Sequence, residues 1–459
     1  MSEATGKQSA LVVATVSSFL APFLSGSVNV ALPTIGSHFQ MSAAVLGWIP
    51  TSYLLAGSVL LVPFGRMADI VGRRRVFFHG ISFYTLSSLL AAAAPSAPVL
   101  IVARVLQGTS VAMIFGIGIA ILTSVFPPQE RGRALGINAA SVYAGLSLGP
   151  FLGGVLTQHL GWRSVFGANL LLGAFAMFLV LTRLRSEWAE VRDERFDLKG
   201  SLLYSLSLLA VMYGFSVLPG RTGAALVGTG IAGSIIFVRL QLRSSSPVLD
   251  INLFRRNRVF AFSSLATFLN YSAAFATNFL MSLYLQNIRG LSPRDAGLLL
   301  LVQPVLMAAG SPFAGRLSDR IRAGVVASLG MGVIAGGLFF FAFLGEATPL
   351  PAIGVGLASL GFGFALFSSP NTNAAMGAVD RSVYGVAAGI LATTRMNGQT
   401  MSLGIATMLL ALFVGGAQLT PEVRPQFIRA VNTAFGLFSA LCLFGVFASL
   451  VRDRRSDIA

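Results

Sequence analysis

Two arginines lie inside long apolar stretches of the sequence, where a charged side chain is expensive. Arg104 has Gln107 one helical turn away, and Arg395 has Asn397 and Gln399 close by. Each arginine either bonds to backbone carbonyls as part of the structure or marks a functional site. Two such charges without a nearby acid would favour neutral, zwitterionic or anionic molecules over cations.

The 16 acidic residues all fall in loops or at the ends of the predicted helices. No embedded carboxylate is left to titrate, and the other groups that could carry a proton are Asp69, Asp319, Asp295, Glu346 and the histidines. The sequence contains no metal-ligand cluster, nucleotide-binding loop or hydrolytic triad. We therefore expect neither an enzyme nor a bound metal or cofactor.

The composition is that of a chain that crosses a membrane many times. Of its 459 residues, 55% are hydrophobic and only 10% are charged, and the mean hydropathy is +0.78. An isolated segment in lipid can satisfy its backbone hydrogen bonds only as a helix, and such a helix needs about 20 residues to cross the bilayer. The sequence thus predicts an all-α polytopic membrane protein, in which the 50 glycines let helices approach closely.

About 14 apolar spans are long enough to cross the bilayer. They lie at residues 10 to 32, 44 to 64, 76 to 96, 98 to 125, 133 to 158, 163 to 183, 200 to 218, 222 to 241, 259 to 286, 293 to 315, 323 to 345, 350 to 378, 383 to 415 and 429 to 451. With the N-terminus inside, 24 of the 32 lysines and arginines fall on the cytoplasmic side, 6 fall outside and 2 lie within helices. This bias predicts that both termini are cytoplasmic, and it accounts for the net charge of +16 without a nucleic-acid partner.

A short pattern recurs after the second and the tenth span. GRMADIVGRRR begins at Gly65 and GRLSDRIRAG begins at Gly315, with Gly, Arg and Asp in matching places. Eight spans separate the two copies, which predicts two six-helix halves with two helices inserted between them. We assign residues 1–185 to the N-terminal bundle, 186–256 to the linker and the inserted helices, and 257–459 to the C-terminal bundle.

In each copy an acidic residue, Asp69 or Asp319, can accept N–H groups at a neighbouring helix N-terminus. Gly65 and Gly72 would allow a tight turn in the first copy, and its arginines, beginning with Arg73, would hold the turn at the headgroups. A simple basic loop is the alternative to a gating loop at this place.

The predicted fifth helix carries small residues on one face. Gly145, Gly149 and Gly153 follow one another at four-residue spacing, with Gly154 beside them, and Pro150 removes a backbone donor and allows a bend. Taken alone, this stripe indicates helix packing.

Polar and aromatic side chains within the spans are candidates for lining a central cavity. Apolar walls with a few polar groups suit a site for amphipathic molecules, and the chain has 36 phenylalanines. Packing also explains any single one of these residues. Besides the two arginines and their polar neighbours, the candidates are Asn29, Trp48, Tyr53, Asn138, Asn270, Tyr271, Asn278, Asn371 and Asn373.

Several further motifs occur along the chain in a fixed order. They are VNVALP at 28–33, GWIPTSYLLAG at 47–57, RVLQG at 104–108, GLSLGPFLGG at 145–154, GWRSVF at 161–166, PVLDINLFR at 247–255 and GVAAGILATTRMNGQTMSLGIA at 385–406. At these helix positions, and with the repeated loop, they resemble the major facilitator superfamily. The arrangement of six, two and six helices resembles its fourteen-helix drug:proton antiporter branch, the multidrug exporters.

The resemblance implies a transporter that exports small amphipathic compounds by alternating access, driven by protons. It also implies that the loop at Asp69 locks one face closed against the start of the thirteenth helix. The glycines and proline of the fifth helix would form a hinge between the halves, and Arg104 would take part in proton coupling. We expect a monomer in the cell membrane, whose partners are lipid, a small-molecule substrate and protons.

One position departs from that family. Many members carry an aspartate in the first helix, five residues before the Asn of VNVALP, and this chain has Leu24 there. The departure removes the usual proton carrier and argues against dicationic substrates. Two alternatives to a proton-driven exporter remain: an uncoupled facilitator or uptake carrier of a metabolite, and a non-transporting receptor or scaffold.

Overall fold

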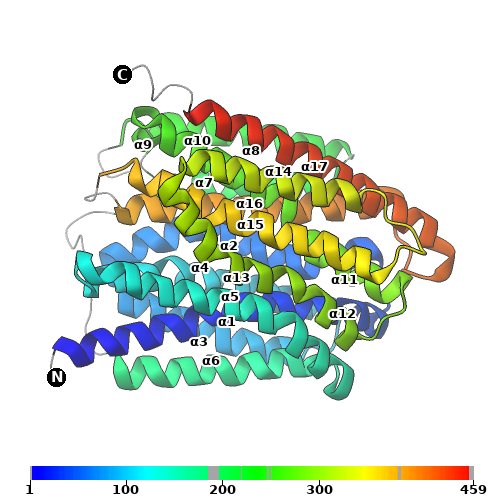
Figure 1. Cartoon of the computed structure of the whole chain (residues 1–459). Coiled ribbons are helices and arrows are strands. Elements are labelled where there is room, and N and C mark those ends of the chain that lie inside the picture. The colour runs from blue at the N-terminus through cyan, green and yellow to red at the C-terminus, as the bar shows by residue number, and fades with distance from the viewer. Residues whose placement is uncertain are drawn as a thin grey trace.

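The computed structural model describes residues 3–184, 196–218, 220–244, 248–249, 251–380 and 384–453. Within these ranges the chain forms long helices that run side by side along one axis (Figure 1). Helix α1 begins and helix α17 ends at the same end of the bundle, which we call the terminal end. The basic residues predict that this end is cytoplasmic.

Six helices form the N-terminal half. Helix α1 packs against α5, α6 and α4, while α3 lies beside α4 and α6. Their bounds are α1 (Glu3–Phe39), α2 (Ala43–Val71), α3 (Arg73–Ala92), α4 (Ala97–Val125), α5 (Pro128–Leu160) and α6 (Arg163–Arg183).

The C-terminal half contains two interrupted helices. Its first spanning segment is divided into α10 (Arg258–Ala274), α11 (Thr277–Leu283) and the π-helical turn η1 (Tyr284–Ile288). Where α10 gives way to α11, the Ala276 N–H donates to the Ser402 Oγ at 2.9 Å, so the break is satisfied by a neighbouring helix. The rest of the half comprises α12 (Pro293–Leu300), α13 (Val302–Arg320), α14 (Ala323–Phe341), α15 (Leu350–Gly377), α16 (Tyr384–Phe413) and α17 (Arg424–Asp453), with the short elements α9 (Asn252–Arg256) and η3 (Pro421–Val423).

Two inserted helices, α7 (Leu198–Ser216) and α8 (Arg221–Gln241), pack against each other. Helix α7 also contacts α2 and α16, which come from different halves. Ser205 donates to the Val59 carbonyl of α2 at 3.0 Å. The inserted pair therefore lies against the seam between α2 and α16.

The predicted spans each correspond to one helix or to two or three consecutive helical elements, and the all-α expectation is confirmed for the described residues. Thirteen helices in the described ranges are long and apolar enough to span a membrane. The remaining predicted span is α3, which packs among the others but begins with three arginines and is less apolar. The predicted ends were wrong by several residues: α1 begins at Glu3 rather than residue 10 and continues to Phe39 rather than residue 32. An apolar window marks only the part that suits lipid, whereas the backbone hydrogen bonds continue into the polar ends.

Candidate functional site

Arg104 is enclosed between three helices of the N-terminal half. Its guanidinium donates to the Ile49 carbonyl of α2 at 3.1 Å and to the Gln107 Oε1 at 2.7 Å, and it lies 4.1 Å from the ring centre of Tyr53. Gln107 in turn donates to the Ser88 Oγ of α3 at 2.9 Å. Only 1% of the Arg104 surface is exposed. The structure thus brings three predicted site residues together and gives the arginine partners within the protein.

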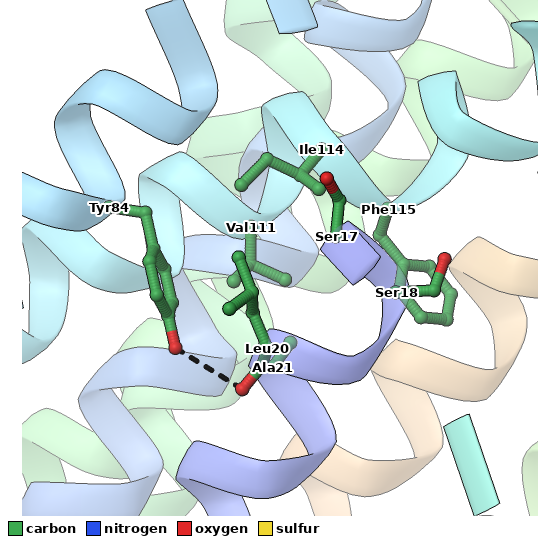
Figure 2. Close-up of a pocket in the computed structure, with 8 residues that line it drawn as sticks. All are labelled: Ser17, Ser18, Leu20, Ala21, Tyr84, Val111, Ile114 and Phe115. Atoms are coloured by element: carbon green, nitrogen blue, oxygen red, sulfur yellow. Dashed lines mark hydrogen bonds between the residues drawn. The ribbon is translucent and has the colours of Figure 1, made fainter. Parts of the chain in front are cut away.

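A second buried network, which the sequence analysis missed, lies one turn away on α3. The Tyr84 hydroxyl is 2.7 Å from the Asn169 Oδ1 of α6 and 3.2 Å from the Leu20 carbonyl oxygen of α1. Figure 2 shows this hydroxyl beside a small pocket between α1, α3 and α4. In the sequence, Tyr84 and Ser88 stand one helical turn apart within an apolar span. This spacing of two polar side chains is the feature from which the network could have been predicted. The pocket belongs to the N-terminal half alone.

Arg395 has different surroundings in the C-terminal half. Its guanidinium carbon lies 5.2 Å from the ring centre of Tyr271, and its Nε is buried without a hydrogen-bond partner. Asn270, which precedes Tyr271 on α10, is completely buried with both amide atoms unpartnered. The Asn278 Oδ1 on α11 is also buried without a partner. This half therefore contains polar groups with unused hydrogen-bonding capacity.

Leu24 is completely buried in the hydrophobic core. The acidic residues found in helices lie close to helix ends, as Asp69 does in α2, Glu130 in α5 and Asp295 in α12. In the described ranges, neither Arg104 nor Arg395 forms an ion pair. The interior of the membrane region is therefore electropositive near these two side chains.

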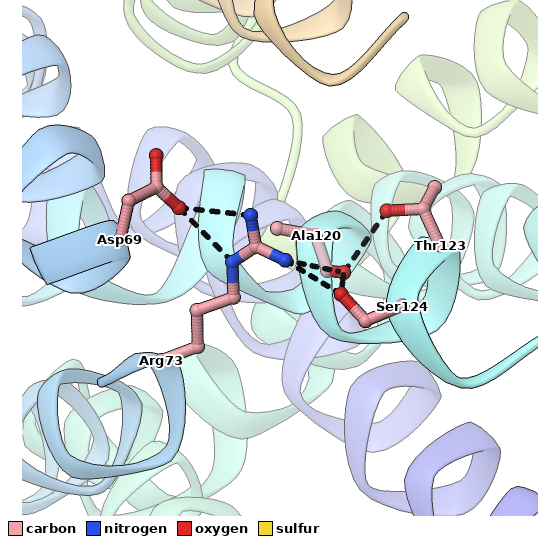
Figure 3. A network of polar contacts seen from close by, with 5 residues as sticks. All are labelled: Asp69, Arg73, Ala120, Thr123 and Ser124. Atoms are coloured by element: carbon pink, nitrogen blue, oxygen red, sulfur yellow. Dashed lines mark hydrogen bonds and ion pairs between the residues drawn. The ribbon is translucent and has the colours of Figure 1, made fainter. Parts of the chain in front are cut away.

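Asp69 forms an ion pair at the turn between α2 and α3. Its Oδ1 accepts from the Arg73 Nε at 3.0 Å and the Arg73 Nη2 at 2.8 Å, and the Arg73 Nη1 reaches the Ser124 Oγ of α4 at 2.5 Å (Figure 3). The side chain of Arg73 is 6% exposed and that of Asp69 is 29% exposed. The pair ties the turn to the end of α4.

The turn is made by one glycine rather than two. Gly72 has a φ of 123°, a conformation that favours glycine, whereas Gly65, which we placed in the turn, lies within α2. The second copy behaves similarly, since Gly315 lies within α13. The side chain of Asp319 lies outside the described residues, so its predicted role stays a prediction.

Two of the predicted asparagines tie helices together. The Asn138 Nδ2 donates to the Ser18 Oγ at 2.8 Å and joins α5 to α1. The Asn371 Nδ2 donates to the Thr267 Oγ1 at 2.9 Å and joins α15 to α10. Both side chains are almost fully buried, which is the arrangement expected of packing residues.

Trp48 faces the inserted helix α7, since its ring centre is 5.5 Å from that of Tyr213. The Asn397 Oδ1 is buried without a hydrogen-bond partner. The remaining candidates differ in exposure: Asn29 is buried, Gln399 is half-buried and Asn373 is exposed.

The glycine stripe of α5 packs directly against α1. A Cβ at Gly145 would come within 2.8 Å of the Phe19 carbonyl oxygen, and one at Gly149 within 2.8 Å of the Phe23 carbonyl oxygen. A Cβ at Gly153 would come closer still to the Ser27 Cα. Since the next residue, Gly154, contacts the backbone of α12 in the other half, this segment joins α1 and α12 through α5.

The two halves meet at the end of the bundle opposite the terminal end. The Gln286 Nε2 donates to the Val30 carbonyl at 2.9 Å, and the Ala43 N–H donates to the Ala417 carbonyl at 3.2 Å. The Pro150 carbonyl lies against Gly297 of α12. Backbone contacts between α5 and α12 and between α2 and α16 therefore hold this end closed.

Comparison with known proteins identifies the family that has this helix arrangement. Residues 14–403 match the model of the Major Facilitator Superfamily. The chain is 35% identical over 411 residues to the multidrug resistance protein Stp of Mycobacterium tuberculosis, covering 88% of this chain and 75% of that protein. It is 27% identical to the riboflavin transporter RibZ of Clostridioides difficile, covering 97% and 98%, and 28% identical to the tetracenomycin C resistance and export protein of Streptomyces glaucescens, covering 89% and 78%.

A solved structure supports the fold. A bacterial homologue of the human lysosomal transporter Spinster, in an inward-facing and unoccupied conformation, aligns with a TM-score of 0.69 at 15% identity, covering 98% of this chain and 97% of that one. The relatives are transporters rather than enzymes, in agreement with the sequence analysis. The chain is a multi-pass cell membrane protein that belongs to the Major Facilitator Superfamily.

Proposed function

We propose that this protein is a secondary active transporter that exports small amphipathic compounds by alternating access, driven by the proton gradient. The observation that carries the proposal is the closed contact of the two halves at one end, made largely by backbone atoms and glycines. Such an interface separates without breaking side-chain ion pairs, which suits rocking of the halves. The names of the multidrug resistance and export relatives support the substrate class and the direction.

The charge of the interior supports a preference among substrates. Arg104 and Arg395 contribute positive charge within the helices, and Leu24 replaces the aspartate expected from the family resemblance. Neutral or anionic amphipathic compounds should therefore be transported better than dications. A metabolite carrier is the second candidate function, because a riboflavin transporter aligns over nearly the full length of both chains.

Reconstituted protein tests these proposals. Proteoliposomes with an imposed pH gradient would be loaded with a cationic compound such as tetraphenylphosphonium, a neutral one or an anionic one. Transport accompanied by proton movement in the opposite direction supports the exporter, and transport unaffected by the gradient supports the carrier. If tetraphenylphosphonium is the best substrate, the charge preference is wrong, and if no compound moves, transport itself is refuted for this panel.

The gate assignment at Asp69 makes a separate prediction. The contacts between α2 and α16 run antiparallel, with Gly47 facing Thr407 and Gly57 facing Met396. Continued to the terminal end, this register brings Asp69 level with the start of α16. Asp69→Asn should lower the transport rate at least about tenfold, because it weakens a charge-assisted contact of the turn, yet leave substrate affinity within about twofold.

The matched control is Glu130→Gln. Glu130 pairs with Lys7 at 3.3 Å at the same end of the bundle, but its side chain is 52% exposed. An exposed pair contributes little, so this variant should transport at the wild-type rate. Rates and equilibrium binding would be measured on the same preparations, and equal loss of both in Asp69→Asn would contradict the gate.

A further inference from the structure

Three arginines lie within the packed helices, and they differ in how far the protein satisfies them. Arg73 bonds to Asp69 and Ser124, and Arg104 bonds to Ile49 and Gln107. Arg395 forms no hydrogen bond with the described part of the protein, and its Nε is buried. The residue as a whole is partly exposed. An arginine without partners inside a membrane-spanning segment is costly, so it is expected to have a ligand in part of the working cycle.

The protein holds Arg395 in place by its backbone and by aromatic contact. Gly398, one turn further along α16, lets the two helices approach, since a Cβ there would lie 2.7 Å from the Phe268 carbonyl oxygen and 3.0 Å from the Tyr271 Cβ. This approach sets Arg395 beside the face of Tyr271. The Tyr271 ring is itself fixed by Phe364 of α15, 5.6 Å away and edge-on. The guanidinium is thus oriented, although its hydrogen bonds are unused.

We propose that Arg395 and Tyr271 form a subsite that binds the anionic group of an amphipathic substrate. This inference rests on the proposed transport function and names the residue that gives it a charge preference. An organic anion at this place would accept charge-assisted bonds from Arg395, and the aromatic ring of Tyr271 would contact its apolar part. Arg104 has no such role, because its Nε and Nη1 are hydrogen-bonded within the protein and the residue is only 1% exposed.

Two probes that differ only in charge test the subsite. 8-Anilinonaphthalene-1-sulfonate and N-phenyl-1-naphthylamine share one aromatic skeleton, and only the first carries a sulfonate. Saturable binding of each would be measured by fluorescence to the purified full-length protein in nanodiscs, with empty nanodiscs subtracted. Arg395→Gln should weaken sulfonate binding at least about tenfold and change binding of the uncharged probe less than about twofold. Arg395→Lys, which keeps the charge, should stay within about threefold of the wild type for both.

The control is Arg221→Gln, which removes the same charge from an exposed position at the start of α8 and should bind both probes normally. Unchanged sulfonate binding in Arg395→Gln, or an equal loss of both probes, would overturn the subsite. Thermal unfolding of each variant, together with binding of the uncharged probe, shows whether the fold is kept. If binding depends on Arg395 but proteoliposomes transport neither probe, the subsite stands and the transport proposal fails for this class. If both probes are transported without dependence on Arg395, transport stands and the subsite fails.

Discussion

Arg104→Ala is expected to reduce transport at least about fiftyfold while the protein still folds and inserts. Arg104 supports the segment of α2 on either side of Thr51, because it bonds to the Ile49 carbonyl and lies over Tyr53. Thr51 is in turn 3.5 Å from Thr407 of α16, where the two halves meet. Losing the guanidinium leaves the buried Gln107 Oε1 without its donor, at about 1 to 3 kcal/mol. Loss of the guanidinium is therefore expected to disturb the interface between the halves, on which transport depends.

The matched control is Arg163→Gln. Arg163 resembles Arg104 in its contacts, since it donates to the Ala94 carbonyl at 2.9 Å and lies 4.3 Å from a ring centre of Trp162. It lies at the edge of the N-terminal half, so its loss should lower the unfolding temperature without stopping transport. Rates in proteoliposomes and thermal unfolding would be compared for both variants. Wild-type rates in Arg104→Ala would reduce Arg104 to a structural residue.

Much of the fold could be predicted because an isolated segment in the lipid bilayer can satisfy its backbone hydrogen bonds only as a helix. The spans follow from hydropathy. The repeat after the second and the tenth span follows from the matching Gly, Arg and Asp residues. The break between α10 and α11 could not be predicted, because it depends on Ser402, which is distant in sequence and adjacent in space. The role of Gly65 was misjudged for a related reason: a glycine near a basic loop marks the turn only when its φ requires it, and that glycine is Gly72.

The candidate site was predicted less completely. Residue type identified both internal arginines as costly, but only the contacts distinguish Arg104, whose Nε and Nη1 are hydrogen-bonded, from Arg395, whose buried Nε has no partner. Composition likewise grouped Asn138 with Asn270, although the first is bonded to α1 and the second has no partner. Whether a polar side chain in a helix is satisfied depends on which helix faces it, and a single sequence carries no direct record of that.

Oxidation of the double variant Ala43→Cys and Ala417→Cys is expected to stop transport, and reduction to restore it. The Ala43 N–H donates to the Ala417 carbonyl across the halves at 3.2 Å. This direct backbone hydrogen bond places the two residues side by side, and a disulfide joins residues whose Cα atoms are about 4.4 to 6.8 Å apart. A bond there would hold this end closed, so the halves could no longer alternate. Transport would be measured before oxidation, after oxidation and after reduction, with crosslinking followed by electrophoresis after proteolysis between the halves.

The native cysteine should not take part in the crosslinking, because Cys442 is completely buried and donates to the Met331 carbonyl at 3.3 Å. Each single cysteine variant should transport normally under oxidising conditions. Adding Gly297→Val should lower the crosslinking yield several-fold, since a side chain at Gly297 would collide with the Pro150 carbonyl and separate the halves at the same end. Full transport by the crosslinked protein would show that this end need not open, and alternating access between these halves would then be wrong.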